Sequence, residues 1–291
     1  MNVRELGVIP SSNLDADKPR LGQSEWLAKV GRKLGSRYLA QLAGDSPDRK
    51  HRQEPVELVT WQRQPTMLAE SFRTVLTSIL FAEQNGSQPR VLVFTSSSPL
   101  EGKTTVVSNL AIALAEITRR VLVIDCDLRR PRQHRVFNLG NSWGLTDLLR
   151  ERKPIPDYPS EALSKETRIP NLWLLPSGPG AISISSLLHC SRLPDLLERY
   201  RAEFDMVLID TPPMLQLSDA RILGRLSDGV VLVCRAGHTL LDNSMLSARR
   251  LEEDGIPVLG AILNDWDPTK HGGYGYDGRY YEYLHGKAVN Q

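Results

Sequence analysis

The sequence predicts an α/β protein with a mostly parallel central sheet and helices on both of its faces. Six short apolar runs are rich in Val, Ile and Leu and do not alternate with polar residues, a pattern typical of parallel strands buried on both faces. The segments between them, such as residues 105–117 and 240–253, are long enough for the helices that connect parallel strands. The runs occupy residues 91–94, 121–124, 172–175, 206–209, 230–234 and 258–263.

The composition excludes several classes of protein. The net charge of the 291 residues is only +2, so no general field attracts nucleic acid, and we expect no nucleic-acid partner. Cys126, Cys190 and Cys234 are too few and too scattered for a disulfide framework or a zinc site, which favours a reducing compartment. No apolar run approaches the roughly 18 residues that span a bilayer. These features together predict a cytoplasmic protein.

Three regions differ in character along the chain. Residues 1–54 are polar with mixed charges, which predicts a flexible arm with one candidate docking helix at residues 26–39. Residues 55–268 carry the α/β pattern, preceded by helical spacing of apolar residues between positions 68 and 80. Residues 269–291 form a Gly- and Tyr-rich tail without a core-forming pattern.

A phosphate-binding loop follows the first predicted strand. The sequence Thr-Ser-Ser-Ser-Pro-Leu-Glu-Gly-Lys-Thr-Thr at residues 95–105 stands between a strand and a helix, which is the context of a P-loop. Lys103 is expected to reach the β- and γ-phosphates of ATP, and the Thr104 hydroxyl to bind Mg²⁺. Ser97 replaces the first glycine of the usual pattern, and a chance Gly-Lys-Thr turn is the alternative. The other nucleotide-binding candidates in the loop are Ser98, Glu101, Gly102 and Thr105.

Acidic residues end two further predicted strands. Asp125 and Asp127 follow residues 121–124, and Asp210 follows residues 206–209. The carboxyl ends of parallel strands meet at one edge of a sheet, so these acids should lie near the phosphates. We expect Asp210 to help hold Mg²⁺. Of the other two, one would hold Mg²⁺, with Asp125 as the candidate, and the other would accept a proton. The sequence leaves their roles open, and a strand-end Asp that caps a turn is the alternative.

The motifs at residues 98–104, 124–129 and 209–213 resemble the Walker A, A′ and B motifs of the bacterial protein-tyrosine kinases. The resemblance covers roughly residues 56–283, and the Asp-x-Asp-x-Arg motif is its most specific part. It implies an ATP-dependent tyrosine autokinase that controls capsule and exopolysaccharide synthesis. It also implies that Asn264 lies near the adenine and that Arg235 belongs to the nucleotide site.

The tail agrees with this resemblance. Five of the eight tyrosines lie within ten residues, at Tyr274, Tyr276, Tyr280, Tyr281 and Tyr283. The resemblance implies that this cluster is the phospho-acceptor and that a tyrosine enters the active site of another subunit. A sticky aromatic tail and a partner-docking segment are the alternatives.

The resemblance also carries expectations about partners. Relatives have a Glu-x-x-Arg-x-x-Arg helix that helps to build a ring of subunits, and this chain has Glu70, Arg73 and Leu76 at those positions. We therefore expect a homo-oligomer in which Leu76 weakens the ring. The chain looks like the free-standing form, recruited to the inner face of the membrane by the cytoplasmic tail of a membrane polysaccharide co-polymerase. A cognate tyrosine phosphatase is the remaining expected partner.

Three points stay open at the level of sequence. A partitioning or positioning ATPase switch on the same fold is one rival, although such proteins usually carry an early P-loop lysine where this chain has Ser96, Ser97 and Ser98. A nucleotide-binding regulatory scaffold with little kinase activity is another. A basic strip of residues beside the phosphate site is either functional or a solvated helix face. It consists of Arg129, Arg130, Arg132 and Arg135.

Overall fold

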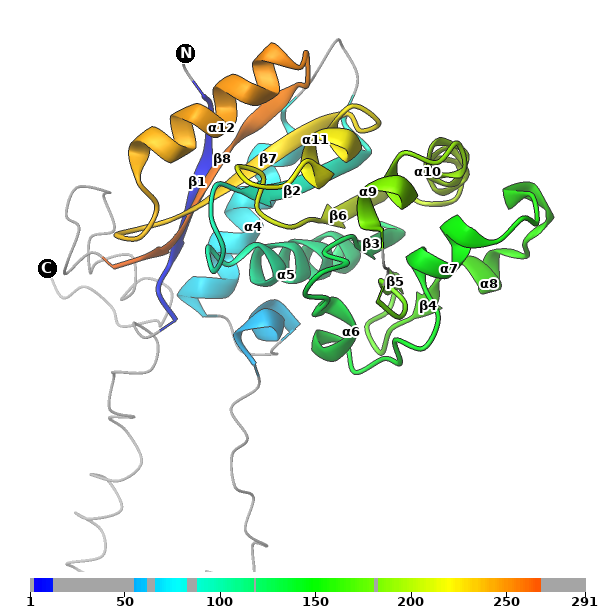
Figure 1. Cartoon of the computed structure of the whole chain (residues 1–291). Helices are drawn as coiled ribbons and strands as arrows, with labels where there is room; N and C mark the ends of the chain where they lie inside the picture. The colour runs from blue at the N-terminus through cyan, green and yellow to red at the C-terminus, as the bar shows by residue number, and fades with distance from the viewer. Residues whose placement is uncertain are drawn as a thin grey trace, which may run out of the picture.

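A computed structural model describes residues 3–12, 55–61, 66–82, 88–117, 119–180 and 183–267. Eight strands form one sheet in the order β1-β8-β7-β2-β6-β3-β5-β4, and every neighbouring pair is parallel except β4 and β5 (Figure 1). The predicted fold class is confirmed, and each of the six apolar runs forms a strand. The strands are β1 Glu5–Pro10, β2 Val91–Ser96, β3 Val121–Asp125, β4 Lys165–Glu166, β5 Leu172–Leu175, β6 Met206–Asp210, β7 Gly229–Arg235 and β8 Val258–Trp266.

Helices cover both faces of the sheet, which explains why the first four residues of β2, β3 and β6 are all apolar. In β2, Leu92 and Phe94 belong to the core cluster under α4 and α5, whereas Val91 and Val93 belong to the cluster on the opposite face. All four side chains are fully buried. The helices are η1 Val56–Trp61, α4 Met67–Leu80, α5 Lys103–Glu116, α6 Gln133–Val136, α7 Leu145–Arg150, η2 Ile155–Asp157, α8 Ser160–Leu163, α9 Ile184–Leu188, α10 Arg192–Glu203, α11 Asp219–Gly224 and α12 Leu241–Glu253.

Strand β1 corrects the prediction of a flexible arm over residues 1–54, which is wrong for Glu5–Pro10. This segment pairs in parallel with β8 at the edge of the sheet and buries Leu6 and Ile9. Gly7 has φ +148°, and a Cβ atom there would lie 2.9 Å from Cγ2 of Val75 on α4, so a larger residue would not fit. The sequence did not predict this strand because glycine and proline interrupt a short run whose partner lies at the other end of the chain.

Other parts of the arm and the tail lie outside the described residues. These are the candidate helix at residues 26–39 and the tyrosine cluster between Tyr274 and Tyr283. In the part of the chain that the structure does describe, no helix combines the length and the hydropathy that a membrane span requires.

The order of the central strands brings the predicted acids together. Strand β6 lies between β2 and β3, with Asp210 paired in register with both Phe94 and Asp125. The P-loop leaves the carboxyl end of β2, so the loop and both acids meet at the carboxyl ends of the central strands. Open α/β sheets bind their ligands at this end of the strands.

Candidate active site

Gly102 and Asn264 fix the shape of the P-loop. Gly102 precedes the first residue of α5 and has φ +89°, and a Cβ atom there would lie only 2.1 Å from Nδ2 of Asn264. The same Nδ2 donates a hydrogen bond to the carbonyl oxygen of Glu101 at 3.0 Å. Strand β8 therefore braces the loop, and the loop leads directly into the N-terminus of a 14-residue helix. The first N–H groups of such a helix have no partner within the helix and favour anions.

Lys103 is held inside this loop. Its Nζ atom donates to Oγ of Ser96 at 3.0 Å, and the side chain is buried. Burial lowers the pKa of Lys103, against the opposing effect of nearby acids, chiefly Asp210. The residue is a buried cation among acids, a placement that suits contact with an anionic phosphate.

Asp125 and Asp210 each leave one buried oxygen without a partner among the described residues. Oδ2 of Asp125 accepts hydrogen bonds from the backbone N–H groups of Arg132 and Gln133, at 3.0 and 2.9 Å. Oδ2 of Asp210 accepts from Nε2 of Gln133 at 2.8 Å. In both residues Oδ1 is buried and unpaired. Buried polar atoms normally find partners, so this pair marks a place for a ligand.

The residues around these oxygens fit a magnesium ion. The Thr104 hydroxyl lies against Asp210, so three hard oxygen groups converge beside the loop. Mg²⁺ prefers such ligands and takes its remaining ligands from water and phosphate. Among the described residues, no cluster of three or more His, Cys, Asp or Glu side chains could hold a metal ion. The two acids and the Thr104 hydroxyl suit a metal that completes its coordination with nucleotide phosphates and water.

Burial also sets the protonation of the two acids. Desolvation raises the pKa of Asp210 to about 6, although Lys103 and Gln133 oppose the shift. Desolvation and the negative charge of Asp210 raise the pKa of Asp125 well above its usual range. A positive charge near the two acids would lower both pKa values, so a bound cation would stabilise their ionised forms.

Asp127 differs from these two acids. It is half-buried, it lines the main cavity, and its Oδ1 accepts a hydrogen bond from the Arg130 backbone N–H at 3.0 Å. The cavity has a volume of about 680 Å³ and is also lined by Ser98, Lys103, Thr104 and Thr105. Asp127 is thus reachable from the cavity, whereas Asp125 is enclosed at the end of its strand.

Three of the four arginines in the basic strip line the same cavity, namely Arg129, Arg130 and Arg132. Arg132 is ion-paired with the buried Glu57 of η1, and Nη2 of Arg129 lies 3.6 Å from Oδ1 of the buried Asp219. Arg135 is exposed and does not line the cavity. The strip is therefore part cavity wall and part solvent-exposed surface.

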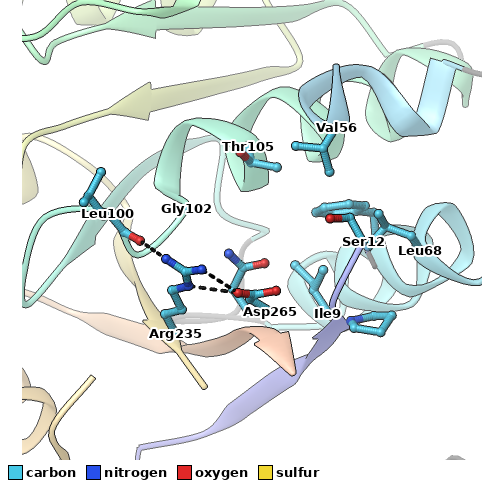
Figure 2. A pocket seen from close by; sticks show the side chains of 12 residues that line it. Ile9, Ser12, Val56, Leu68, Leu100, Gly102, Thr105, Arg235 and Asp265 are labelled. Atoms are coloured by element: carbon cyan, nitrogen blue, oxygen red, sulfur yellow. Dashed lines mark hydrogen bonds and ion pairs between the residues drawn. The ribbon is translucent and has the colours of Figure 1, made fainter. Parts of the chain in front are cut away.

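A smaller side pocket of about 210 Å³ opens next to the P-loop (Figure 2). It shares Leu100, Gly102, Thr105 and Arg235 with the main cavity, so the two lie next to each other. Its remaining walls are mostly apolar and come from β1, η1, α4 and β8. They are Ile9, Pro10, Ser12, Val56, Leu68, Phe72, Asn264 and Asp265.

Arg235 closes one side of this pocket. Its Nε and Nη2 atoms lie 2.9 and 2.8 Å from Oδ2 of Asp265, and its Nη1 donates to the carbonyl oxygen of Leu100 at 3.3 Å (Figure 2). The predicted nucleotide-site residues Arg235 and Asn264 thus both contact the P-loop backbone. Arg235 ends β7 and Asn264 lies in β8, so the two residues connect these strands to the P-loop.

Glu101 is placed differently from the other loop residues. Its side chain is fully buried and lines neither cavity. Burial raises the pKa of Glu101, while the Thr239 hydroxyl opposes the shift. The Glu101 side chain therefore reaches neither cavity, although the sequence suggested a nucleotide contact.

Two contributors to the site were missed from the sequence. Gln133 is fully buried and joins Asp125, Asp210 and Ser108 through three hydrogen bonds. It lies six residues after Asp127, close enough in sequence to have been considered as part of that motif. The end of β1 gives no such signal, because its role depends on pairing with β8.

Comparison with known proteins identifies the family of this chain. A family model described as an AAA domain matches residues 100–240. The tyrosine-protein kinase YwqD of Bacillus subtilis is 37% identical over 210 residues, which cover 72% of this chain and 86% of YwqD. The chain belongs to the bacterial tyrosine-protein kinases. It is therefore a tyrosine-protein kinase that binds nucleotide through its P-loop.

Structural similarity supports the same family for this tyrosine kinase. The kinase domain of the Escherichia coli tyrosine kinase ETK matches with a TM-score of 0.70 at 29% identity, over 94% of this chain and 95% of that domain. The tyrosine-protein kinase Wzc of Salmonella typhimurium is 37% identical over 222 residues, but the match spans only 30% of Wzc. The chain thus corresponds to a part of the longer relatives.

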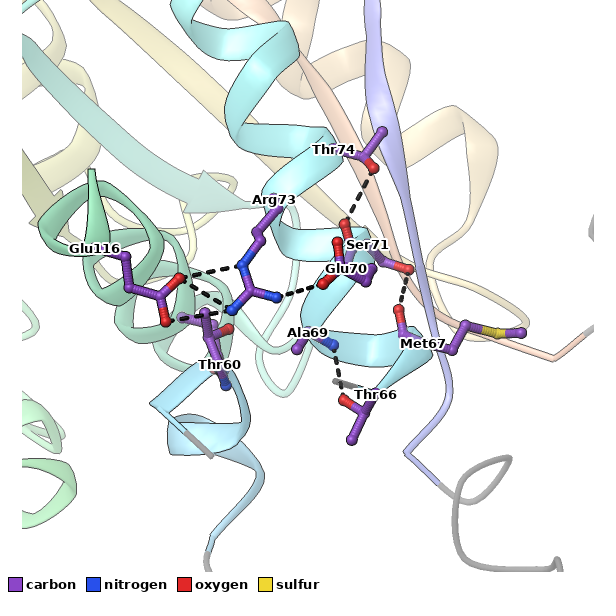
Figure 3. Close-up of polar contacts among 10 residues, drawn as sticks. Thr60, Thr66, Met67, Ala69, Glu70, Ser71, Arg73, Thr74 and Glu116 are labelled. Carbon is purple, nitrogen blue, oxygen red and sulfur yellow. Dashed lines mark hydrogen bonds and ion pairs between the residues drawn. The ribbon is translucent and has the colours of Figure 1, made fainter. Parts of the chain in front are cut away.

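Helix α4 of this tyrosine kinase carries Glu70, Arg73 and Leu76, the positions that the family resemblance associates with a ring. Nη1 of Arg73 lies 2.5 Å from Oε1 of Glu70, and its Nη2 lies 3.0 Å from Oε2 of Glu116 on α5 (Figure 3). Leu76 is buried in the core. The first two residues of the motif are therefore paired within the subunit, and the third supports the packing of α4.

Proposed function

We propose that this kinase transfers the γ-phosphoryl group of ATP to its own C-terminal tyrosines and thereby regulates capsule or exopolysaccharide synthesis. The observation that carries the proposal is the pair of unpartnered buried oxygens on Asp125 and Asp210 beside Lys103. Phosphoryl transfer to a tyrosine also needs a group that receives the proton of its hydroxyl, and Asp127 lines the main cavity.

In the proposed complex, Lys103 contacts the β- and γ-phosphates, and the first turn of α5 surrounds them with N–H groups. The adenine ring of ATP occupies the side pocket against the apolar wall of Ile9, Val56 and Phe72, next to Asn264. This division is supported by chemistry, since the main cavity is lined by cations and the side pocket is largely apolar.

Thr104, Asp125 and Asp210 would hold Mg²⁺. When bound, the ion neutralises charge on the phosphates as the phosphoryl group leaves. Asp127 would accept the proton of the tyrosine hydroxyl, because among the three acids it lines the cavity from which that hydroxyl approaches. The proposal thus assigns metal binding to Asp125 and proton acceptance to Asp127, the two roles that the sequence left open.

The acceptors are Tyr274, Tyr276, Tyr280, Tyr281 and Tyr283, and we propose transfer between subunits of a homo-oligomer. The cytoplasmic tail of a membrane polysaccharide co-polymerase would activate the kinase and hold it at the inner face of the membrane. A tyrosine phosphatase would reverse the reaction. Family resemblance supports these partners.

The test is a phosphorylation assay with ATP and Mg²⁺, in the absence and presence of that cytoplasmic tail, read by mass spectrometry. Phosphotyrosine should accumulate between Tyr274 and Tyr283. Lys103→Met should reduce it at least about 100-fold, because the charge that stabilises the transferred phosphate is lost. Bound nucleotide without any phosphotyrosine in this segment would refute the autokinase and favour a regulatory scaffold.

A further inference from the structure

An exposed apolar patch lies at the rim of the main cavity. It consists of Leu100 at the tip of the P-loop and Leu240, Leu241 and Met245 at the start of α12, and we name it the α12 patch. The exposed fractions of Leu100 and Leu241 are 75% and 74%, and those of Leu240 and Met245 are 67% and 51%. Leu241 and Met245 are four residues apart on one face of α12, and Leu100 lines the main cavity together with Asn243 of the same helix. Exposed apolar side chains grouped in this way are typical of interaction sites.

Direct contacts join α12 to the P-loop. Oγ of Ser247 donates to Oγ of Ser97 at 3.0 Å, and Asn243 lines the main cavity together with Leu100. The opposite face of α12 already packs on the sheet through Ala248 and Leu251. The helix therefore carries apolar residues on two faces, and only one of them has a partner among the described residues.

The polypeptide itself contains a segment that fits the patch. Residues 268–291 follow the last described residue and contain five tyrosines and Leu284. Their charged residues nearly balance, with Lys270, Arg279 and Lys287 against Asp277 and Glu282. Electrostatic attraction would therefore contribute little. Tyrosine rings offer an apolar face for the patch and a hydroxyl for the cavity beside it.

The length of this segment allows it to reach another molecule. Strand β8 ends at Trp266, and two residues earlier Asn264 contacts the P-loop. Tyr274 and Tyr283 are seven and sixteen residues beyond Asp267, which corresponds to at most about 25 and 58 Å of extended chain. A folded domain of this size is roughly 45 Å across. The cluster can thus extend beyond its own domain to the cavity of an adjacent one.

We propose that the α12 patch binds the Tyr274–Tyr283 segment of a neighbouring copy and presents its hydroxyls one after another to the cavity. The proposal rests on the autokinase function stated above. One tyrosine ring lies on Leu241 and Met245 while another places its hydroxyl near Asp127. Docking then raises the local concentration of acceptors without taking part in phosphoryl transfer.

Two chains separate the acceptor from the enzyme in the kinetic test. The acceptor is the full chain with Lys103→Met, and the enzyme is the full chain with all five tail tyrosines changed to Phe. We expect Leu241→Ser with Met245→Ser in the enzyme to raise KM for the acceptor about tenfold, with kcat within twofold. The matched control is Phe81→Ser, which removes an apolar side chain of 71% exposure at the other end of the domain and should change neither value. An unchanged KM, or a fall in kcat alone, would overturn the proposal.

A binding experiment keeps this result separate from the kinase activity. A fluorescent peptide of residues 268–291 should bind the five-Phe chain without ATP, and the α12 double variant should weaken binding about tenfold. If the peptide binds but nothing is phosphorylated, the docking surface stands and the autokinase fails. If phosphorylation occurs but the variant binds the peptide normally, the docking surface is refuted. In the wild-type chain, a phosphorylation rate per molecule that stays constant on dilution to concentrations at which light scattering detects only monomers would mean that the chain's own tail supplies the acceptor, which would overturn the neighbouring copy.

Discussion

The centre and the edge of the sheet contribute to the active site in different ways. At the centre, β2, β6 and β3 lie side by side and bring Lys103, Asp210 and Asp125 together. At the edge, β1 and β8 form an apolar side pocket with α4 and η1. The central residues belong to short motifs, whereas the edge pocket needs segments from both ends of the chain. The comparison shows that the residues around the P-loop are encoded locally, whereas the side pocket depends on assembly of the fold.

The strongest test of the centre concerns its buried charge. The pKa of Asp210 is about 6 in the folded protein, above the value of about 3.9 in an unfolded chain. Its contribution to stability is therefore fully present below pH 4 and is lost as the pH rises to about 6. In protein without Mg²⁺ and nucleotide, Asp210→Asn should not lose this stability. Its free energy of unfolding at pH 7 should therefore exceed that of the wild type by about 3 kcal/mol. Kinase activity should nevertheless fall at least about tenfold.

Denaturant unfolding of both proteins between pH 3.5 and 7.5 measures this difference. The free energies of unfolding should diverge between pH 4 and 6 and then run parallel. Saturating ADP and Mg²⁺ should reverse the order of stability, because the wild-type acid then has a cation beside it. Parallel curves across the whole range would mean that burial does not raise the pKa of Asp210.

The edge is tested by Gly7→Val. The new side chain would collide with Val75 and require an unfavourable φ, so β1 should detach from β8 and open the side pocket. We expect the dissociation constant for ATP to rise about tenfold, while kcat at saturating ATP stays within twofold. Gly140→Val is the matched control, since a Cβ atom there meets nothing within 4 Å. A tenfold loss of kcat with unchanged affinity would assign β1 to the chemistry instead.

Asn264 joins the two regions and should give the smallest effect. Asn264→Ala removes its hydrogen bond to the Glu101 carbonyl, a loss of about 1 kcal/mol. ATP affinity measured by titration calorimetry should fall about fivefold. Asn264→Asp keeps the size but faces that carbonyl with an acceptor, so it should weaken binding at least as much. If Asp binds as well as Asn, the contact does not brace the loop.

Helix α4 shows how tertiary context changes the meaning of a residue. In the sequence, Leu76 stands at a position where relatives have an arginine, which suggested that a contact of the ring had been lost. In the structure it is 4% exposed within the core, while Arg73 is occupied by Glu70 and Glu116. Helical spacing predicts which residues of a helix share an apolar face. Only the packed structure shows whether a given residue on that face contacts the core or is available to another subunit.

The sequence by itself determined the fold class, the P-loop and the acids at the ends of two strands. Each of these depends on residues close together in the chain, where strand, loop and helix follow one another. Only the tertiary structure decided that Asp127 faces the cavity while Asp125 is enclosed, that Gln133 joins the two buried acids, and that Glu5–Pro10 forms a wall of the side pocket. These outcomes depend on pairing and burial between distant segments, and a short motif holds no information about either.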